Sequence, residues 1–186
     1  MTIRVFSNGG GVQSTAALVL SARGEIDFPV HLFANVGDDS ENPGTLDYVR
    51  NISMPYAKSH GVELIEICRV TKAGVAETLM EFTVKPSRSI GIPVRLSSGA
   101  PGTRQCTSVF KLAPVRKYLK ANGATKANPA QLGIGISLDE IHRAKRVDSD
   151  DIQIRSYPLL DLGLTRKDCH RIIAEAGLPQ PPKSSC

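Results

Sequence analysis

The sequence predicts an α/β fold, a doubly wound parallel sheet with helices on both faces. Short apolar runs alternate along the chain with longer segments that have the spacing of amphipathic helices. A glycine-rich loop separates the first apolar run from the first helical segment. The chain contains no Trp and only 5% aromatic residues, which favours aliphatic packing between a sheet and its helices. Strands that alternate with helices need right-handed crossovers, and such crossovers produce a parallel sheet.

Each element is expected from a local pattern. Strands are expected at residues 3–6, 28–35, 62–68, 132–136 and 152–159. Helices are expected at residues 12–22, 45–60, 71–82, 106–121, 137–145 and 165–176. Pro55 leaves the middle of the second helix open. Thr165 is the expected N-cap of the last helix, and Gly177 follows its expected end. Residues 83–105, with three Pro and three Gly, are expected to form a long loop.

Length and composition predict one globular protein of ordinary type. The chain has 186 residues, of which 41% are hydrophobic and 22% charged. Its longest apolar run is too short to cross a bilayer, and its N-terminus lacks the pattern of a signal peptide. We therefore expect a cytoplasmic protein without a membrane partner. The net charge of +5 suits a polyanion such as a nucleotide or nucleic acid, and it equally suits an ordinary solvated surface. The sequence leaves the oligomeric state open.

A glycine-rich turn, Gly9-Gly10-Gly11-Val12-Gln13-Ser14-Thr15, lies between a predicted strand and a predicted helix. Glycines let backbone N–H groups approach an anion, and the helix N-terminus adds roughly half a positive charge. No Lys follows as in a Walker A loop, and the last glycine of a dinucleotide fingerprint is missing. We expect a phosphate site of another type; a tight turn without a ligand is the alternative. The candidate binding residues are Ser7, Gly9, Gly10, Gly11, Gln13, Ser14 and Thr15.

This loop resembles the Ser-Gly-Gly-x-Asp-Ser loop of the PP-loop superfamily, the adenine nucleotide alpha hydrolase-like proteins. Gly9 and Gln13 stand where that family has its first Ser and its Asp. Four later segments resemble the branch that is similar to phosphoadenosine phosphosulfate (PAPS) reductase, a branch that includes proteins of DNA sulfur modification. They are residues 33–39 (FANVGDD), 106–114 (CTSVFKLAP), 135–143 (GISLDEIHR) and 181–186 (PPKSSC). The resemblance covers nearly the whole chain.

The resemblance implies an adenine-nucleotide site at the carboxyl ends of the strands. Beyond the loop, it implies nucleotide contacts from Phe33, Ala34, Asn35, Asp39, Lys111, Gly135, Asp139 and Glu140. Arg143 is the expected anion-binding and catalytic arginine, because a guanidinium makes paired bonds to phosphate or sulfate. Mg²⁺ would accompany ATP, although Gln13 cannot supply the carboxylate of the family's Asp. Three arginines, Arg88, Arg95 and Arg104, either close over an anionic substrate or are scattered surface charge.

Four cysteines, at positions 68, 106, 169 and 186, are expected to be free thiols. The resemblance implies that Cys106 and Cys186 bind an iron–sulfur cluster, with an incomplete ligand set because the family's last Cys is missing. Cys169 is either a further ligand or a packed helix residue, and Cys68 is expected in the core. Alternatively, Cys106 and Cys186 are catalytic nucleophilic or redox thiols, or thiols without chemistry.

Three functions follow from the resemblance. A PAPS reductase-like enzyme would use a thiol reductant and an adenylyl sulfate, and Gln13 favours this hypothesis. An ATP-dependent sulfurtransferase would adenylate DNA or tRNA and then deliver sulfur from a donor, which the positive charge favours. The third hypothesis is a non-catalytic nucleotide-binding subunit of a modification or defence complex. The nucleotide-binding domain is expected to span residues 1–160. Residues 161–186 are expected to form a C-terminal helix and a tail that ends in Cys and is incomplete relative to the family.

Overall fold

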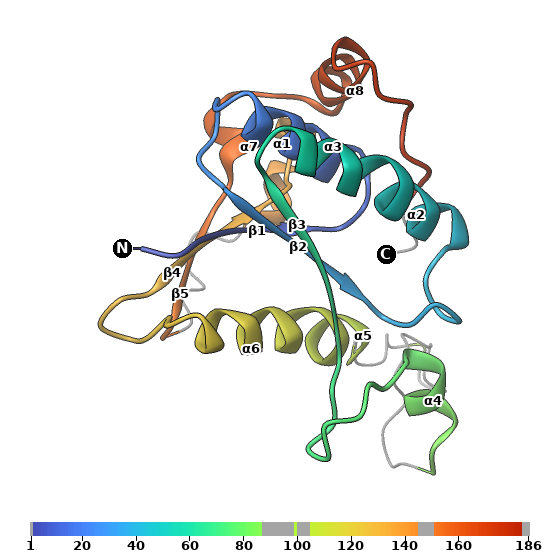
Figure 1. Cartoon of the computed structure of the whole chain (residues 1–186). Coiled ribbons are helices and arrows are strands. Elements are labelled where there is room, and N and C mark those ends of the chain that lie inside the picture. The colour runs from blue at the N-terminus through green and yellow to red at the C-terminus, as the bar shows by residue number, and fades with distance from the viewer. Residues whose placement is uncertain (1, 87–98, 100–104, 145–150, 184–186) are drawn as a thin grey trace.

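The computed structural model describes residues 2–86, 99, 105–144 and 151–183. Five strands form one sheet in the order β3-β2-β1-β4-β5, and every neighbouring pair is parallel. Helices cover both faces of the sheet (Figure 1). The predicted α/β fold with a doubly wound parallel sheet is therefore confirmed. Among the described residues, no helix has the length and apolar character needed to cross a membrane.

The elements follow the alternation expected from the sequence. The strands are β1 Arg4–Asn8, β2 Val30–Asn35, β3 Glu63–Cys68, β4 Ala130–Ile134 and β5 Gln153–Ser156. The helices of the first half are α1 Val12–Ala22, α2 Pro43–Tyr48, the π-helical turn η1 Val49–Ser53, α3 Met54–Ser59 and α4 Leu79–Val84. Those of the second half are α5 Gln105–Thr107, the π-helical turn η2 Ser108–Leu112, α6 Ala113–Ala121, the 3-10 helix η3 Leu138–Arg143, α7 Pro158–Asp161 and α8 Arg166–Glu175.

Two apolar cores join the helices to the sheet. On one face, α1 packs against α8, and Ala16 and Ile173 belong to the same buried cluster. On the other face, α6 buries Val115 and Leu119 against Leu32 of the sheet. Figure 1 shows α1, α3 and α8 above the sheet and α6 below it. The two layers of helices leave the carboxyl edge of the sheet between them.

The strand order reverses between β1 and β4. From β1 the chain winds outward through β2 to β3, and it then returns to β4 on the other side of β1. Open α/β sheets bind their ligands at such a switch point, beyond the carboxyl ends of the strands. The glycine loop follows β1 and residues 135–143 follow β4. Two segments predicted to bind the nucleotide therefore lie at the switch point.

Both π-helical turns precede a proline. Pro55 is the second residue of α3, directly after η1, and Pro114 is the second residue of α6, directly after η2. In a regular helix, proline removes one hydrogen bond and its ring clashes with the carbonyl four residues earlier. The wider π turn accommodates the ring, so helical structure is continuous over residues 43–59 and 105–121. The predicted helix at residues 45–60 therefore continues through Pro55.

Several predicted boundaries are wrong. The helix predicted at residues 71–82 begins only at Leu79, because Gly74 has a φ of +81° and Thr78 forms a capping box with Glu81. The strand predicted at residues 152–159 ends at Ser156, since Pro158 cannot donate a sheet hydrogen bond and instead begins α7.

The helix predicted at residues 137–145 is a 3-10 helix with a kink at Glu140. One burial prediction also fails. Cys68, expected in the core, is exposed at the end of the edge strand β3, because an edge strand has a neighbour on one side only.

Candidate functional site

The glycine loop leaves β1 at Asn8 and opens α1. The Asn8 side chain accepts a hydrogen bond from the N–H of Gly10 at 2.8 Å, and Ser14 Oγ accepts one from the N–H of Gly9 at 2.9 Å. Gly10 has a φ of +68°, and a Cβ atom there would lie 2.6 Å from Cγ2 of Thr45. Thr45 is fully buried in α2. The loop backbone therefore lies directly against α2, and position 10 has no room for a side chain.

The N-terminus of α1 has no side-chain cap. Gly11 is its N-cap residue, and no side chain accepts a hydrogen bond from the first turn. No described residue accepts from the N–H groups of Val12, Gln13 or Ser14. Uncapped N–H groups and the positive end of the helix dipole together attract an anion. The Thr15 hydroxyl instead donates to the carbonyl of Gly11 at 3.1 Å, so it stabilises the backbone of the loop.

Gln13 connects the glycine loop to the segment after β4. Its Nε2 lies 3.4 Å from Ser137 Oγ and 3.5 Å from Glu140 Oε2. Glu140 Oε2 also accepts a hydrogen bond from Arg143 Nη1 at 2.7 Å. A Cβ atom at Gly135 would lie 3.4 Å from Cβ of Gln13. The structure thus brings four predicted site residues together at the switch point.

Asp139 ties the same segment to α8. Its Oδ2 accepts a hydrogen bond from Ser137 Oγ at 3.2 Å and one from the backbone N–H of Arg166 at 2.6 Å. Ser137 is fully buried and lies between Gln13 and Asp139. Sequence reasoning missed Ser137, although its place directly after a strand at the switch point was a usable signal.

A second polar network lies at the carboxyl ends of β2 and β3. Asn35 Nδ2 donates to Asp38 and to Glu66, both at 2.7 Å, and Arg50 binds both carboxylates. The Arg50 guanidinium lowers the pKa of Asp38 to about 2, and it also lowers the pKa of Glu66. The Asn35 amide is therefore already occupied, and it fixes the loop that follows β2. Phe33 is buried, and its ring lies beside the glycine loop.

Asp39 and Lys111 lie on the side of α4 and η2. Asp39 accepts hydrogen bonds from Ser40 Oγ at 2.7 Å and from Thr78 Oγ1 at 2.9 Å. Lys111 Nζ lies 3.9 Å from Oε2 of Glu41, whose side chain is 4% exposed. No sequence pattern distinguishes Glu41 from the other acids of its loop. These contacts join the loop after β2 to the start of α4 and to η2.

The predicted site cysteines are only partly described. Cys106 is buried in α5 at the carboxyl edge, and its Sγ lies 4.0 Å from Oγ1 of Thr107. Cys169 is buried in the core between α1 and α8, where burial raises the pKa of its thiol to about 11. It is a packed thiol on the other face of the sheet from α5 and α6 (Figure 1). Cys186 lies outside the described residues, as do three arginines, Arg88, Arg95 and Arg104.

The described residues do not by themselves fit an iron–sulfur cluster. In the part of the chain that the structure describes, no three or more His, Cys, Asp or Glu residues are grouped so as to hold a metal ion. Of the two predicted cluster ligands, that part contains Cys106 alone.

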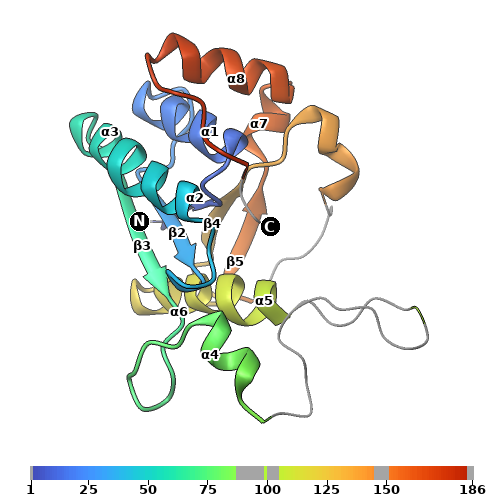
Figure 2. The same cartoon turned by 90° about the vertical axis from the view of Figure 1, so that its right-hand side faces the viewer.

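The C-terminal tail returns toward the glycine loop. The hydroxyl of Tyr48, in α2, donates to the carbonyl of Pro179 at 2.6 Å. Pro182 lies close to Gly44, at the start of α2. Figure 2 shows the tail passing from α8 across α1 toward the carboxyl edge. Tyr48 therefore links the tail to α2, a role that no sequence motif indicated.

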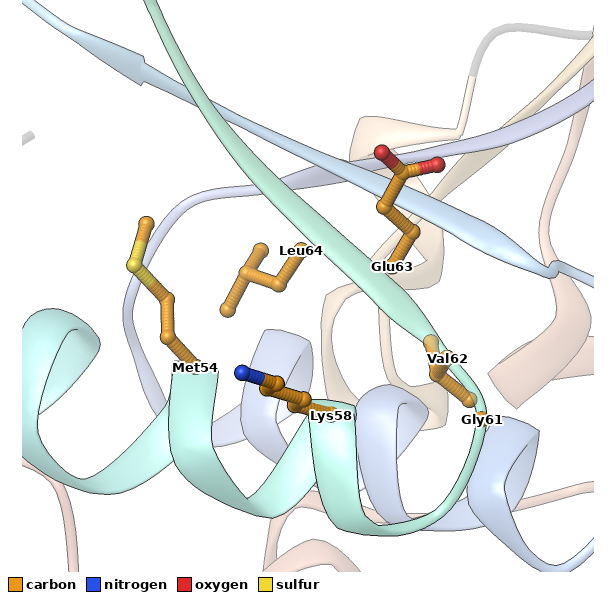
Figure 3. A pocket seen from close by; sticks show the side chains of 6 residues that line it. All are labelled: Met54, Lys58, Gly61, Val62, Glu63 and Leu64. Atoms are coloured by element: carbon orange, nitrogen blue, oxygen red, sulfur yellow. The ribbon is translucent and has the colours of Figure 1, made fainter.

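A separate hollow of about 360 Å³ lies between α3 and β3 (Figure 3). Its lining residues are Met54, Lys58, Gly61, Val62, Glu63 and Leu64. They lie at the amino end of β3, whereas the glycine loop lies at the carboxyl edge. In Figure 3 the Glu63 carboxylate points away from Met54 and Leu64, so polar groups do not converge in the hollow. It is distinct from the glycine loop at the switch point.

Comparison with known proteins shows the fold. No protein-family model matches the sequence, and no curated protein sequence matches it. Among solved structures, the chain is similar to the U34-tRNA thiolase NcsA from Methanococcus maripaludis, a structure described with its 4Fe-4S cluster. The TM-score is 0.58 at 14% sequence identity, and the match covers 99% of this chain and 59% of that chain. This chain thus spans less than two thirds of the thiolase and shares its α/β fold.

Proposed function

We propose that the protein is an adenine-nucleotide-binding enzyme of the PP-loop type that uses ATP to activate RNA for sulfur transfer. The observation that carries the proposal is the glycine loop. It lies at the switch point of the sheet, it presses against α2 at Gly10, and it leaves the first N–H groups of α1 open to an anion. The fold shared with a tRNA thiolase supports RNA as the sulfur acceptor, ahead of the reduction of an adenylyl sulfate.

The residues at the switch point fit a nucleotide polyphosphate. The phosphates would bind at the N-terminus of α1, with the exposed guanidinium of Arg143 beside them. No described residue bonds to the second carboxylate oxygen of Asp139 or Glu140. These two carboxylates would hold Mg²⁺, which would neutralise charge on the phosphates. Gln13 donates to Glu140 and keeps that carboxylate directed at the crevice.

The proposed reaction has two steps. First, a carbonyl oxygen of an RNA base attacks the α-phosphorus of ATP, and pyrophosphate leaves. Second, the outer sulfur of a persulfide on Cys106 attacks the activated carbon, and AMP leaves. A second thiol, from Cys186 or from a small-molecule reductant, then cleaves the resulting disulfide and releases the thiolated base. Buried near the carboxyl edge, Cys106 would be shielded from competing oxidants.

Calorimetry with ATP, AMP and an adenylyl sulfate tests the site, and pyrophosphate release with tRNA and a persulfide donor tests the reaction. We expect ATP to bind and pyrophosphate to appear only when tRNA is present. The variant Cys106→Ser should keep ATP binding and lose sulfur incorporation, whereas Cys68→Ser, which changes an exposed thiol, should retain both. Absence of any adenine-nucleotide binding at millimolar concentration would refute the proposal. Full activity of Cys106→Ser would remove that residue's role.

A reductase of the PAPS reductase type is the second candidate, and Gln13 favours it. The Gln13 amide stands where the family has a carboxylate, so it reduces the negative charge available for Mg²⁺ and can donate to a sulfonate oxygen. In that case an adenylyl sulfate should bind more tightly than ATP, and a dithiol should release sulfite without pyrophosphate. Nucleotide binding without turnover in either assay would instead indicate a non-catalytic subunit. Iron and sulfide analysis after anaerobic purification tests the cluster expected at Cys106 and Cys186.

A further inference from the structure

Positive charge is concentrated in one stretch of the chain. Residues 82–138 contain nine Lys and Arg and no Asp or Glu, whereas the remainder contains 14 Lys and Arg against 18 Asp and Glu. The modest net charge of +5 therefore combines a strongly basic segment with an acidic remainder. A polyanion is recognised when such a segment presents its charge on one surface.

The helix α6 presents part of this charge to solvent. Val115 and Leu119 pack against the sheet, whereas Lys117 and Lys120, three residues apart, lie on the solvent side of the helix. Arg116, four residues before Lys120, is half-buried at the border of this side. Lys117 and Lys120 are exposed, and neither has an ion-pair partner among the described residues. We call Arg116, Lys117 and Lys120 the α6 basic face.

The composition of α6 favours nucleic acid over a membrane. Within α6 no large apolar side chain is exposed, and Leu112, directly before it, is the single exposed large apolar side chain described in the helical run 105–121. A helix that lies on a lipid surface inserts a whole row of apolar side chains. The helix also carries no acidic residue that would neutralise its lysines. Lys and Arg side chains bind the phosphodiester backbone as point charges and forks.

The same helical run carries Cys106 at its other end. Helical structure is continuous over residues 105–121, and a rise of about 1.5 Å per residue places Lys117 and Lys120 about 17 and 21 Å along the axis from Cys106. Figure 1 shows α5 at the carboxyl edge and α6 running beneath the sheet away from it. A nucleic-acid strand advances roughly 3.4 Å per nucleotide. A backbone bound at these lysines therefore brings a nucleotide about five or six positions away to Cys106.

We propose that the α6 basic face is the RNA-docking surface of this protein and positions the acceptor nucleotide at Cys106. The inference rests on the proposed function in taking RNA as the sulfur acceptor. The docking contact itself is with the phosphodiester backbone and is independent of ATP. It predicts binding that weakens steeply with salt and depends little on RNA sequence.

The test is the binding of fluorescently labelled tRNA, measured by anisotropy over a range of salt concentrations. The variant Lys117→Gln/Lys120→Gln is compared with Lys58→Gln/Lys167→Gln, which removes the same charge from exposed lysines of α3 and α8, on the other side of the sheet. Loss of two phosphate contacts should lower the slope of log K against log salt by about 1.4 to 1.8 and weaken binding roughly 10- to 30-fold near physiological salt. The matched variant should stay within about twofold of the wild type.

An equal loss in both double variants would overturn the inference, because net charge alone would then account for binding. Binding to phosphatidylserine vesicles but not to tRNA would overturn it as well. Calorimetry with ATP on the same variants separates the two proposals. Normal ATP binding without α6-dependent tRNA binding refutes the docking surface alone. Absence of ATP binding with α6-dependent tRNA binding refutes the proposed function alone.

Discussion

The substitution Gly10→Ala tests whether the glycine loop is built for close approach. Gly10 has a φ of +68°, and a Cβ atom there would lie 2.6 Å from Cγ2 of Thr45 and 3.2 Å from atoms of Phe33 and Val49. Left-handed backbone costs a non-glycine residue about 1–2 kcal/mol. Overpacking against buried side chains adds about 1–3 kcal/mol. We therefore expect Gly10→Ala to lower the free energy of unfolding by about 2–5 kcal/mol.

Gly24 provides a matched control on the other end of α1. Its φ is +73°, and no atom lies within 4 Å of a Cβ built there. Gly24→Ala therefore carries the backbone cost alone, about 1–2 kcal/mol. The difference between the two variants, about 1–3 kcal/mol, isolates the contact of the loop with α2. Only Gly10→Ala should also weaken ATP binding, because Gly24 lies some twelve residues, roughly 18 Å, from the N-terminus of α1.

Urea unfolding followed by circular dichroism measures the first quantity, and calorimetry with ATP measures the second. Equal loss of stability in the two variants would mean that Thr45 and Val49 yield to the new methyl group. In that event the close approach does not constrain the loop. Unchanged ATP affinity in Gly10→Ala would contradict the assignment of the loop as the phosphate site, whatever its effect on stability.

Two further predictions concern stability. Burial lowers the pKa of His31 to about 3, so between pH 6.5 and 3 the unfolded chain binds a proton that the folded chain does not. The free energy of unfolding should therefore fall by about 1.4 kcal/mol per pH unit as the pH drops from 6.5 toward 3. Urea unfolding of His31→Leu over this pH range should lack that decrease. A variant whose free energy of unfolding depends on pH as strongly as that of the wild type would contradict the prediction. Tyr48→Phe removes the 2.6 Å bond to Pro179 and should cost about 1 kcal/mol and speed hydrogen exchange around residues 178–183. Tyr56→Phe is its control, and equal exchange rates in both variants would show that the tail is held by other contacts.

The fold was predictable where one local signal decided the structure. The glycine loop before α1, and the capping box of Thr165 and Asp168 before α8, each settle the conformation of a few residues. The wrong boundaries lie where two local signals compete. Lys72 and Ala73 are good helix formers, yet Gly74 and the capping box at Thr78 delay the helix to Leu79. Helix propensity summed over residues 71–82 does not reveal whether the helix begins near Thr71 or at Leu79.

The candidate site was predictable as segments and less so as contacts. Resemblance placed Gln13 and Glu140 in one site from opposite ends of the chain, and the structure brings their side chains within 3.5 Å. The partners of Asn35 and Asp39 were not predictable, because Arg50 and Thr78 lie on elements whose packing the sequence does not specify. Long-range side-chain pairs depend on the relative placement of helices, and local patterns carry no information about it.

Gln13 stands where the resembling PP-loop pattern has an Asp, and in this structure its side chain has a defined partner. The Gln13 amide lies 3.5 Å from Glu140 Oε2, which also accepts a hydrogen bond from Arg143, so an aspartate at position 13 would add a second negative charge near Glu140. Two carboxylates at such a distance repel and resist joint ionisation unless a cation lies between them. The amide of Gln13 replaces that repulsion with a hydrogen bond to Glu140, so the segment after β4 is held against the glycine loop without a bound cation. In the proposed function, Gln13 therefore removes one possible Mg²⁺ ligand and holds Glu140 in place instead. The glycine loop accordingly supports the proposal of nucleotide binding more strongly than the proposal of one particular reaction.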